Sequence, residues 1–509
     1  MNQELYEETL TEVNQEQTAS SLHAVEVSLP YFQPLLWSLL LSTLSVANPF
    51  LTFLATNQQS QNLYAGWAQS QGLVAYGHIY GSGGLLFYLA AWAGSLVFGA
   101  VLFAALQAVL LWFMGREVFR LGYNLSGQED FAVYLLHLSY AFVFLLGFGG
   151  LYASIFALPF IFGSLNHLMT YLRDGGTTDK GFIHYGAMAA LAFLMDPLSA
   201  LVFYGLAFLV LLAYNLLHRR KARGLYQLLA SLLGFSLVFY PLGYYTVWKG
   251  TFGLAISQVL YPLESLSLHS HLLVNIFFYG GIVLGLGWLA ALVVNSIAMV
   301  DKQLRMLSFL GILGLLVVLI LAVFQADRGA YQLIPALPFA VLLVGGWLSQ
   351  QVQSANRARH GRSRQTNSVW SVYLKASWYL PILVGLYLLV QPLMQATILS
   401  SQVASERETV ASYIKKQAQV TDRIYAWDDT AALYQASGHL AGANLLTPSL
   451  YMQTSENPIQ LENQIQESQP AYILVKKDLP VFDPVQKLLK ENYKKTSLKL
   501  DKFTLYQLK

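Results

Sequence analysis

The sequence predicts a polytopic α-helical membrane protein of about 11 transmembrane helices with a small extracytoplasmic α/β domain at its C-terminus. Of its 509 residues, 55% are hydrophobic and 11% are charged, whereas soluble domains are about 25% charged. A net charge of +3 is too small over this length to indicate a nucleic-acid partner. The absence of cysteine excludes disulfides, thiolate catalysis and cysteine-ligated metals.

The charges divide the chain into three regions. Residues 1–32 contain six Glu and no Lys or Arg, which predicts a polar cytoplasmic tail and not a signal peptide, since a signal peptide begins with basic residues. Residues 33–400 form the predicted transmembrane domain. Residues 401–509 contain 13 basic and 12 acidic residues, a balance typical of a soluble domain.

Apolar segments long enough to cross about 30 Å of hydrocarbon predict the spans. They are 33–55, 95–114, 131–147, 152–172, 182–195, 198–217, 224–247, 272–300, 306–325, 332–350 and 378–400. With the N-terminus inside, the cytoplasmic loops hold 15 Lys and Arg, and the opposite loops hold only Lys249 and Arg328. This asymmetry follows the positive-inside rule and predicts that the C-terminal domain lies outside.

The C-terminal domain is predicted to alternate helices with strands. Helical periodicity covers 405–417, and further helices are expected at 429–437 and 484–492. Short apolar runs predict strands at 423–427 and 471–476, and 497–507 alternates like an edge hairpin. Such a mixture predicts a small layered α/β fold.

Two outer loops are long, 56–83 and 248–270, and the first carries a series of recognisable segments. These are Leu63-Tyr64-Ala65-Gly66, Ala75-Tyr76-Gly77-His78 and Gly83-Gly84-Leu85-Leu86-Phe87-Tyr88, with Arg328-Gly329-Ala330-Tyr331 at the start of a late span. Together with the topology, they resemble the GT-C-fold glycosyltransferases that depend on polyprenyl-phosphate sugars, a group that includes protein mannosyltransferases and bacterial aminoarabinose transferases. The resemblance implies a GT-C-like membrane domain and glycosyl transfer at the outer membrane face.

The sequence departs from the family pattern at its acidic positions. By spacing, the Asp that opens the first loop in the family falls on Gln58, and a second Asp falls on His78. The resemblance gives that first Asp the role of general base or metal ligand, and a neutral amide does not usefully accept a proton. The departure therefore weakens the prediction of activity more than that of the fold.

The candidate catalytic residues are the titratable groups expected on the outer side: His78, Asp196 and Asp327. An imidazole is a general base near neutral pH, and a carboxylate buried near lipid usually has a partner or a role. Simpler interpretations remain open. Asp196 precedes Pro197 and is expected at a helix cap, Asp327 pairs with Arg328 at a solvated span end, and His78 lies on an interfacial surface.

Further residues are candidates for binding substrate through amide, hydroxyl or charged groups. They are Gln58, Gln61, Tyr64, Tyr76, Lys249, Glu264, Arg328 and Tyr331. Arg328 and Lys249 suit a donor phosphate, although Lys249 also suits an interfacial anchor. No metal ligands are assigned, because His269 and His271 beside Glu264 face one way only in an extended strand; a divalent metal cofactor is left open.

Two hypotheses of function follow. The first is a cell-membrane glycosyltransferase that moves a sugar from a polyprenyl-phosphate donor to a cell-envelope glycan or another extracytoplasmic acceptor. The second is a catalytically degenerate relative that serves as a binding or assembly subunit in envelope polysaccharide synthesis, which the Gln58 replacement favours. A transporter or flippase is disfavoured, since neither internal repeats nor mid-span charges are evident.

Overall fold

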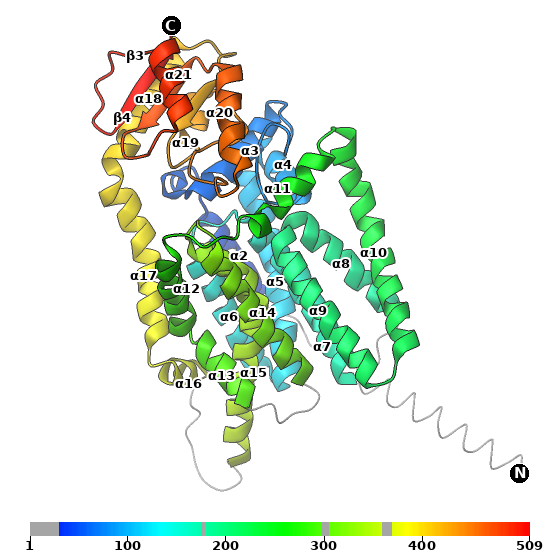
Figure 1. The fold of residues 1–509 in the computed structure, drawn as a ribbon. Helices are drawn as coiled ribbons and strands as arrows, with labels where there is room; N and C mark the ends of the chain where they lie inside the picture. Colours follow the sequence, from blue (N-terminus) through cyan, green and yellow to red (C-terminus); the bar gives the residue numbers. More distant parts are fainter. Residues whose placement is uncertain (1–29, 175–178, 298–304, 359–368) are drawn as a thin grey trace, which may run out of the picture.

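A bundle of long apolar helices forms most of the molecule, and the C-terminal domain (residues 401–509) lies on one end of it (Figure 1). The computed structural model describes residues 30–174, 179–297, 305–358 and 369–509, so the predicted acidic tail falls almost entirely outside the described residues. The helices are α2 (Phe32–Thr43), α3 (Asn57–Ser70), α4 (Leu85–Ser95), α5 (Val101–Ser126), α6 (Glu129–Leu146), α7 (Ala153–Asp174), α8 (Asp179–Met195), α9 (Pro197–Leu217), α10 (Lys221–Trp248), α11 (Phe252–Glu264), α12 (Leu272–Gly285), α13 (Trp288–Ile297), α14 (Arg305–Phe324), α15 (Leu337–Ala358), α16 (Val369–Ala376), α17 (Leu380–Met394), α18 (Ser401–Gln417), α19 (Ala432–Ser437), α20 (Glu456–Ser468) and α21 (Asp483–Asn492). Short helical turns are η1 (Thr52–Leu54), η2 (Ala330–Ala336) and η3 (Gln395–Leu399), and the strands are β1 (Ile424–Trp427), β2 (Tyr472–Lys476), β3 (Tyr493–Lys495) and β4 (Phe503–Leu508).

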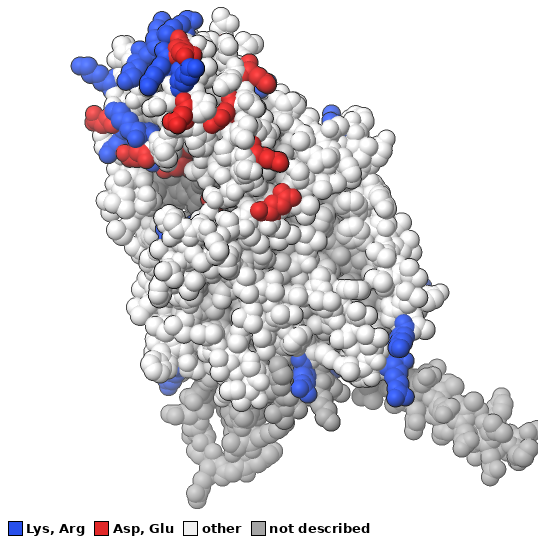
Figure 2. All heavy atoms as spheres, in the orientation of Figure 1, with Lys and Arg blue, Asp and Glu red and all other residues white. Residues whose placement is uncertain are grey.

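The bundle makes this a multi-pass membrane protein. Among the described residues, eight helices are long and apolar enough to cross a membrane, and the bent pair α12 and α13 makes a ninth if it is one span. Large apolar side chains are exposed along the outer helices α10 and α17, as expected where lipid is the solvent. On the face shown in Figure 2, the described charged side chains gather toward the two ends of the molecule, and the belt between them is almost uncharged.

Two of the eleven expected spans are not among the described helices that are long enough to cross a membrane. The segment 33–55 contains only the 12-residue α2 and the short turn η1, because the chain turns after Thr43 and the Asn48 side-chain amide donates to the Thr43 carbonyl oxygen at 3.0 Å. The segment 182–195 lies in α8, which has 17 residues and ends where Asp196 precedes Pro197, since a residue before proline disfavours the helical conformation.

The first long loop contains a helix that hydropathy did not predict. α3 begins with a capping box, in which the Thr56 hydroxyl accepts from the Gln59 backbone N–H at 3.3 Å and the Gln59 side chain accepts from the Thr56 N–H at 2.9 Å. Its sequence is polar, yet ten of its residues are buried. The second long loop likewise contains α11.

The C-terminal domain has a four-stranded sheet in the order β1-β2-β4-β3. β1 and β2 are parallel, β4 is antiparallel to β2, and β3 is antiparallel to β4. The strands near 423–427 and 471–476 and the helices near 405–417 and 484–492 match their predicted positions, whereas α20 was not predicted.

Glycine packing between α8 and α10 offers a test of the fold. A Cβ atom on Gly186 would collide with the Ser231 carbonyl oxygen, and one on Gly234 would collide with the Ile183 carbonyl oxygen. We expect Gly186→Ala to lower the melting temperature in detergent, because overpacking costs about 1–3 kcal/mol. Gly205→Ala is the matched control: it adds the same atom where nothing lies within 4 Å, and it should leave the melting temperature unchanged or higher. Equal melting temperatures for both variants would contradict this packing.

Candidate active site

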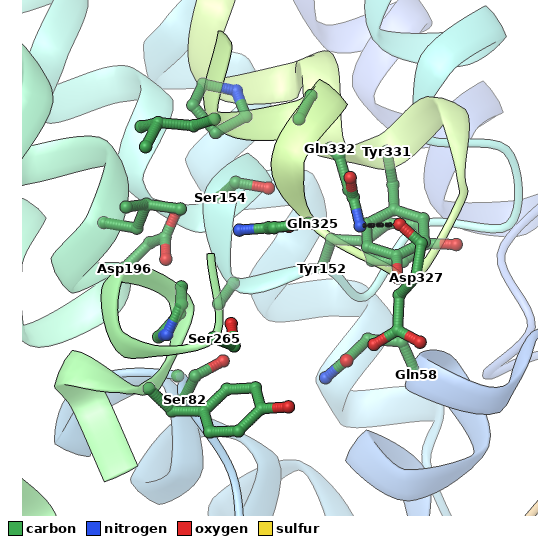
Figure 3. A pocket seen from close by; sticks show the side chains of 18 of the residues that line it. Gln58, Ser82, Tyr152, Ser154, Asp196, Ser265, Gln325, Asp327, Tyr331 and Gln332 are labelled. Carbon is green, nitrogen blue, oxygen red and sulfur yellow. Dashed lines mark hydrogen bonds between the residues drawn. The ribbon is translucent and has the colours of Figure 1, made fainter. Parts of the chain in front are cut away.

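A cleft of about 1040 Å³, partly open to solvent, lies where the bundle meets the C-terminal domain. Its walls come from α3, the segment before α4, the α8–α9 junction, α11, the segment between α14 and α15, and residues 450–453 of the C-terminal domain. Two acids face it from different elements, Asp196 and Asp327. Figure 3 shows them on opposite sides of the cleft.

Asp327 lies in the short connection between α14 and η2. Its backbone oxygen accepts a hydrogen bond from the Gln332 side-chain amide at 2.6 Å, which holds the connection in place. The carboxylate makes no hydrogen bond or ion pair with another described residue, and in Figure 3 it points toward Gln58. Burial raises the pKa of Asp327 to about 6, because desolvation disfavours the charged form.

Asp196 occupies the N-cap position of α9, with Pro197 following at the first helical position. This is the helix-cap placement that the sequence suggested, although the Asp196 side chain makes no capping bond to the helix backbone. It accepts instead a hydrogen bond from the Ser199 hydroxyl. Burial raises the pKa of Asp196 to about 6, and the Ser199 hydrogen bond opposes the rise.

Gln58 projects from the first turn of α3 into the same cleft. Its side-chain amide nitrogen lies 3.1 Å from the Tyr451 hydroxyl and 3.4 Å from the Asn62 side-chain oxygen. The position that holds an Asp in the resembled family is thus an amide beside a cleft that Asp327 also faces. A carboxylate therefore reaches this site from a different element of the chain.

Aromatic rings form part of the cleft wall. Tyr331 stacks on Tyr152 with ring centroids 4.7 Å apart and planes 8° from parallel, and both line the cleft. Flat aromatic faces and hydroxyls suit a sugar, whose apolar C–H face packs on a ring while its hydroxyls bond to polar groups.

Three of the predicted binding residues lie outside the cleft lining and serve as contacts inside the protein. The Gln61 amide donates to Asn57 and to the Thr447 hydroxyl, each at 3.0 Å. The Tyr64 hydroxyl accepts from the Ala441 backbone N–H at 2.9 Å. The Tyr76 hydroxyl donates to the Gly83 carbonyl oxygen at 2.8 Å.

The remaining predicted residues lie on the surface and do not line the cleft. His78 is exposed on a turn, where its Nδ1 accepts from the Val74 backbone N–H at 3.2 Å. Glu264 is exposed at the end of α11, and the ammonium of Lys249 lies 4.3 Å from the centre of the Trp248 ring. Arg328 follows Asp327 directly but is exposed, with its guanidinium 5.8 Å from the centre of the Phe278 ring.

Several cleft residues carry no signal in the sequence. Tyr451 and Gln453 come from the C-terminal domain, more than a hundred residues after the last predicted site residue. Gln332 lies beside the predicted Tyr331, so its place in the segment 328–335 was the only available clue. Ser82, Ser154 and Gln325 are polar residues at helix ends or in loops, and nothing in their local pattern distinguishes them.

The polar lining of the cleft is acidic and neutral. Among the described lining residues, none is Lys or Arg, and the described residues bring no three His, Cys, Asp or Glu side chains together as a metal site.

Comparison with known proteins gives the family. Residues 19–401 match the family described as "Putative competence-induced protein Ccs4 N-terminal domain", and residues 404–509 match the corresponding Ccs4 C-terminal domain. The chain belongs to the Ccs4 family. No curated protein matches this Ccs4 chain.

Solved structures similar to this Ccs4 chain include ArnT from Cupriavidus metallidurans. ArnT bound to undecaprenyl phosphate is 12% identical with a TM-score of 0.58, covering 92% of this chain and 95% of ArnT. ArnT in the apo state is also 12% identical, with a TM-score of 0.56 and 98% coverage of both chains. The GT-C-like fold predicted from the sequence is confirmed, and at this identity the likeness concerns the fold alone.

The raised pKa of Asp327 predicts a pH-dependent stability. The folded-state pKa of about 6 exceeds the ordinary value of 3.8, so the folded protein binds this proton more tightly than the unfolded chain. The stabilisation is complete below pH 3.8 and is lost as the pH rises through about 6. Asp327→Asn, which is neutral at every pH, should therefore raise the melting temperature at pH 7.5 and raise it by about half as much at pH 5.

Glu264→Gln provides the control, since that carboxylate is exposed and its neutralisation should shift the melting temperature little at either pH. An Asp327→Asn effect of the same size at pH 5 and pH 7.5 would contradict a desolvated carboxylate.

Proposed function

We propose that this Ccs4 protein is a membrane glycosyltransferase that transfers a sugar from a polyprenyl-phosphate donor to an extracytoplasmic acceptor, such as a cell-envelope glycan. The observation that carries the proposal is the desolvated Asp327 carboxylate, free of protein partners among the described residues and facing Gln58 across a cleft. The GT-C-like fold supports it, as does the ArnT structure, which was solved with undecaprenyl phosphate.

The proposal includes an orientation. The acidic N-terminal tail and the loops rich in Lys and Arg lie on the cytoplasmic side, and the C-terminal domain and the cleft lie outside. Donor sugar and acceptor would then meet at the outer membrane surface, with the polyprenyl chain in lipid.

Asp327 acts as the general base in this mechanism. An acceptor hydroxyl attacks the anomeric carbon of the donor sugar, its proton passes to the Asp327 carboxylate, and the bond from the anomeric carbon to the phosphate oxygen breaks. The polyprenyl phosphate leaves with the bonding electron pair. A base with a pKa near 6 is ionised at neutral pH and still accepts a proton readily.

The other polar groups bind and orient. Asp196, fixed by the Ser199 hydroxyl, accepts hydrogen bonds from sugar hydroxyls on the far side of the cleft. Since the described residues that line the cleft include no Lys or Arg, the donor phosphate lies at its edge, where Arg328 supplies a bidentate guanidinium. This arrangement separates the anionic part of the donor from the two carboxylates.

The second candidate function, a binding or assembly subunit without catalysis, is favoured by Gln58 alone. It predicts that the protein binds donor lipid but never transfers the sugar. The glycosyltransferase function predicts turnover that requires Asp327.

Replacing the base should abolish transfer without abolishing binding. In nanodiscs supplied with polyprenyl-phosphate sugars and envelope glycan acceptors, we expect Asp327→Asn to lower kcat by at least a hundredfold, with donor affinity retained. Wild-type kcat should fall as the pH drops through about 6, because protonated Asp327 cannot accept a proton. Glu467→Gln, in an exposed part of α20, is the control and should match the wild type. Full activity of Asp327→Asn would refute the mechanism.

Arg328 should act through the donor phosphate. Arg328→Ala should raise the KM for donor about tenfold or more, because a charge-assisted hydrogen bond to phosphate is worth about 1.5–3 kcal/mol, and Arg328→Lys should recover only part of the loss because lysine lacks the bidentate fork. Unchanged KM in both variants would place the phosphate elsewhere.

A further inference from the structure

The segment 447–453 of the C-terminal domain lies against α3 and α11 at the cleft. The Asn57 side-chain amide donates to the Ser449 hydroxyl at 2.9 Å and to the Thr447 hydroxyl at 3.1 Å. At the other end of the segment, the Gln453 backbone N–H donates to the Tyr261 hydroxyl at 3.1 Å. Between these two anchors, Leu450 and Tyr451 form part of the cleft wall.

The backbone of Tyr451 adopts an unusual conformation. Its φ of +65° lies in the left-handed region, which is uncommon for a bulky residue. The Asn457 side-chain amide fixes it by donating to the Tyr451 carbonyl oxygen at 2.6 Å. The Tyr451 ring lies 5.1 Å from that of Tyr80 and 5.2 Å from that of Tyr261, centre to centre. Strained residues held this firmly often occur at ligand sites.

The Tyr451 hydroxyl is positioned to share its hydrogen bonds with a ligand. It lies 3.1 Å from the amide nitrogen and 3.3 Å from the amide oxygen of Gln58. A hydroxyl has one hydrogen to donate. When it accepts from the Gln58 nitrogen, its hydrogen remains to be donated, either to the neighbouring Ser82 or to a ligand, and the Gln58 oxygen is left to accept.

That combination of one donor and one acceptor side by side matches a sugar hydroxyl, which both donates and accepts. Burial raises the pKa of Tyr451, with the Asp327 charge adding to the rise, so the phenol keeps its proton. Both side chains line the cleft that Asp327 and Tyr331 also face.

We propose that Tyr451 and Gln58 form a hydroxyl-binding pair for the donor saccharide, so that the C-terminal domain supplies a substrate-binding residue to a site otherwise built by the bundle. The inference rests on the proposed function for the identity of its ligand. It gives the segment 447–453 of the C-terminal domain a role in recognising the sugar.

The test compares lipids with and without a sugar, in the absence of acceptor. The full chain in nanodiscs is titrated with undecaprenyl phosphate and with undecaprenyl phosphate carrying glucose, galactose or N-acetylgalactosamine. The wild type should bind at least one sugar-bearing lipid more tightly than undecaprenyl phosphate. Tyr451→Phe, which removes only the hydroxyl, should lower the affinity for that sugar-bearing lipid about threefold to tenfold. It should leave the affinity for undecaprenyl phosphate unchanged.

Two further variants separate a binding role from a folding role. Tyr506→Phe removes a hydroxyl from β4 of the C-terminal domain, away from the cleft lining, and it should bind every lipid like the wild type. Gln58→Ala should lower the affinity for the sugar-bearing lipid as Tyr451→Phe does. The double variant should lose little more affinity than either single variant, because the two residues act as a unit.

The proposal is overturned if Tyr451→Phe binds the sugar-bearing lipid as tightly as the wild type, or if it lowers the affinity for both lipids equally. It is also overturned if no sugar-bearing lipid binds the wild type more tightly than undecaprenyl phosphate. Failure of the glycosyltransferase function would be seen separately, as an absence of transfer in the presence of acceptor, because lipid binding is measured here without turnover.

Discussion

The burial of a polar helix is the constraint on which the site depends. α3 carries Gln, Asn and Ser on nearly every face, and buried polar groups are costly unless they are hydrogen-bonded. On one side, the Gln59 amide donates to the Phe148 and Gly150 carbonyl oxygens, both at 2.8 Å, and the Asn62 amide donates to the Leu151 oxygen at 2.9 Å. These bonds satisfy carbonyls where the chain turns into α7 and hold α3 on the end of the bundle.

The other side of α3 is satisfied by the C-terminal domain. The Ser60 hydroxyl accepts from the Ala431 backbone N–H at 3.0 Å, and the Gln435 side-chain amide donates to the Leu63 carbonyl oxygen at 2.9 Å. The Tyr64 ring packs 5.1 Å from the Tyr434 ring, centre to centre. The bundle and the C-terminal domain are both needed to satisfy the polar groups of α3. The helix therefore joins the two, and the cleft forms where all three meet. Gln61, Tyr64 and their neighbours are thus needed for the architecture of the site.

The sequence predicted what depends on composition and periodicity. Long apolar runs predicted most spans, and β1, β2 and most helices of the C-terminal domain followed from local patterns. The hairpin expected at 497–507 overlaps β4 but not β3, which lies before it at Tyr493–Lys495. α3 was not predicted, because a polar segment of low hydropathy was interpreted as a loop. The capping box at Thr56 was nevertheless present in the sequence. Of the candidate site residues, Gln58, Asp196, Asp327 and Tyr331 line one cleft, and His78 does not; their roles stay predictions. Tyr451 could not be predicted, since its place depends on a tertiary contact about 390 residues away along the chain.

Gln58 and Asp327 are best understood together. Taken alone, an amide at the position where the resembled family has an acid argues against catalysis. A carboxylate at position 58 would, however, face the Asp327 carboxylate, and two like charges in one desolvated site force one of them to stay protonated. With an amide at position 58, Asp327 faces a neutral hydrogen-bonding group, so burial alone sets its pKa near 6 and it remains ionised at neutral pH. Under the proposed function, the absence of one acid and the presence of another on a different element therefore describe one electrostatic arrangement, in which Asp327 is the carboxylate on the Gln58 side of the cleft, Asp196 lies on the opposite side, and the amide is left to recognise substrate.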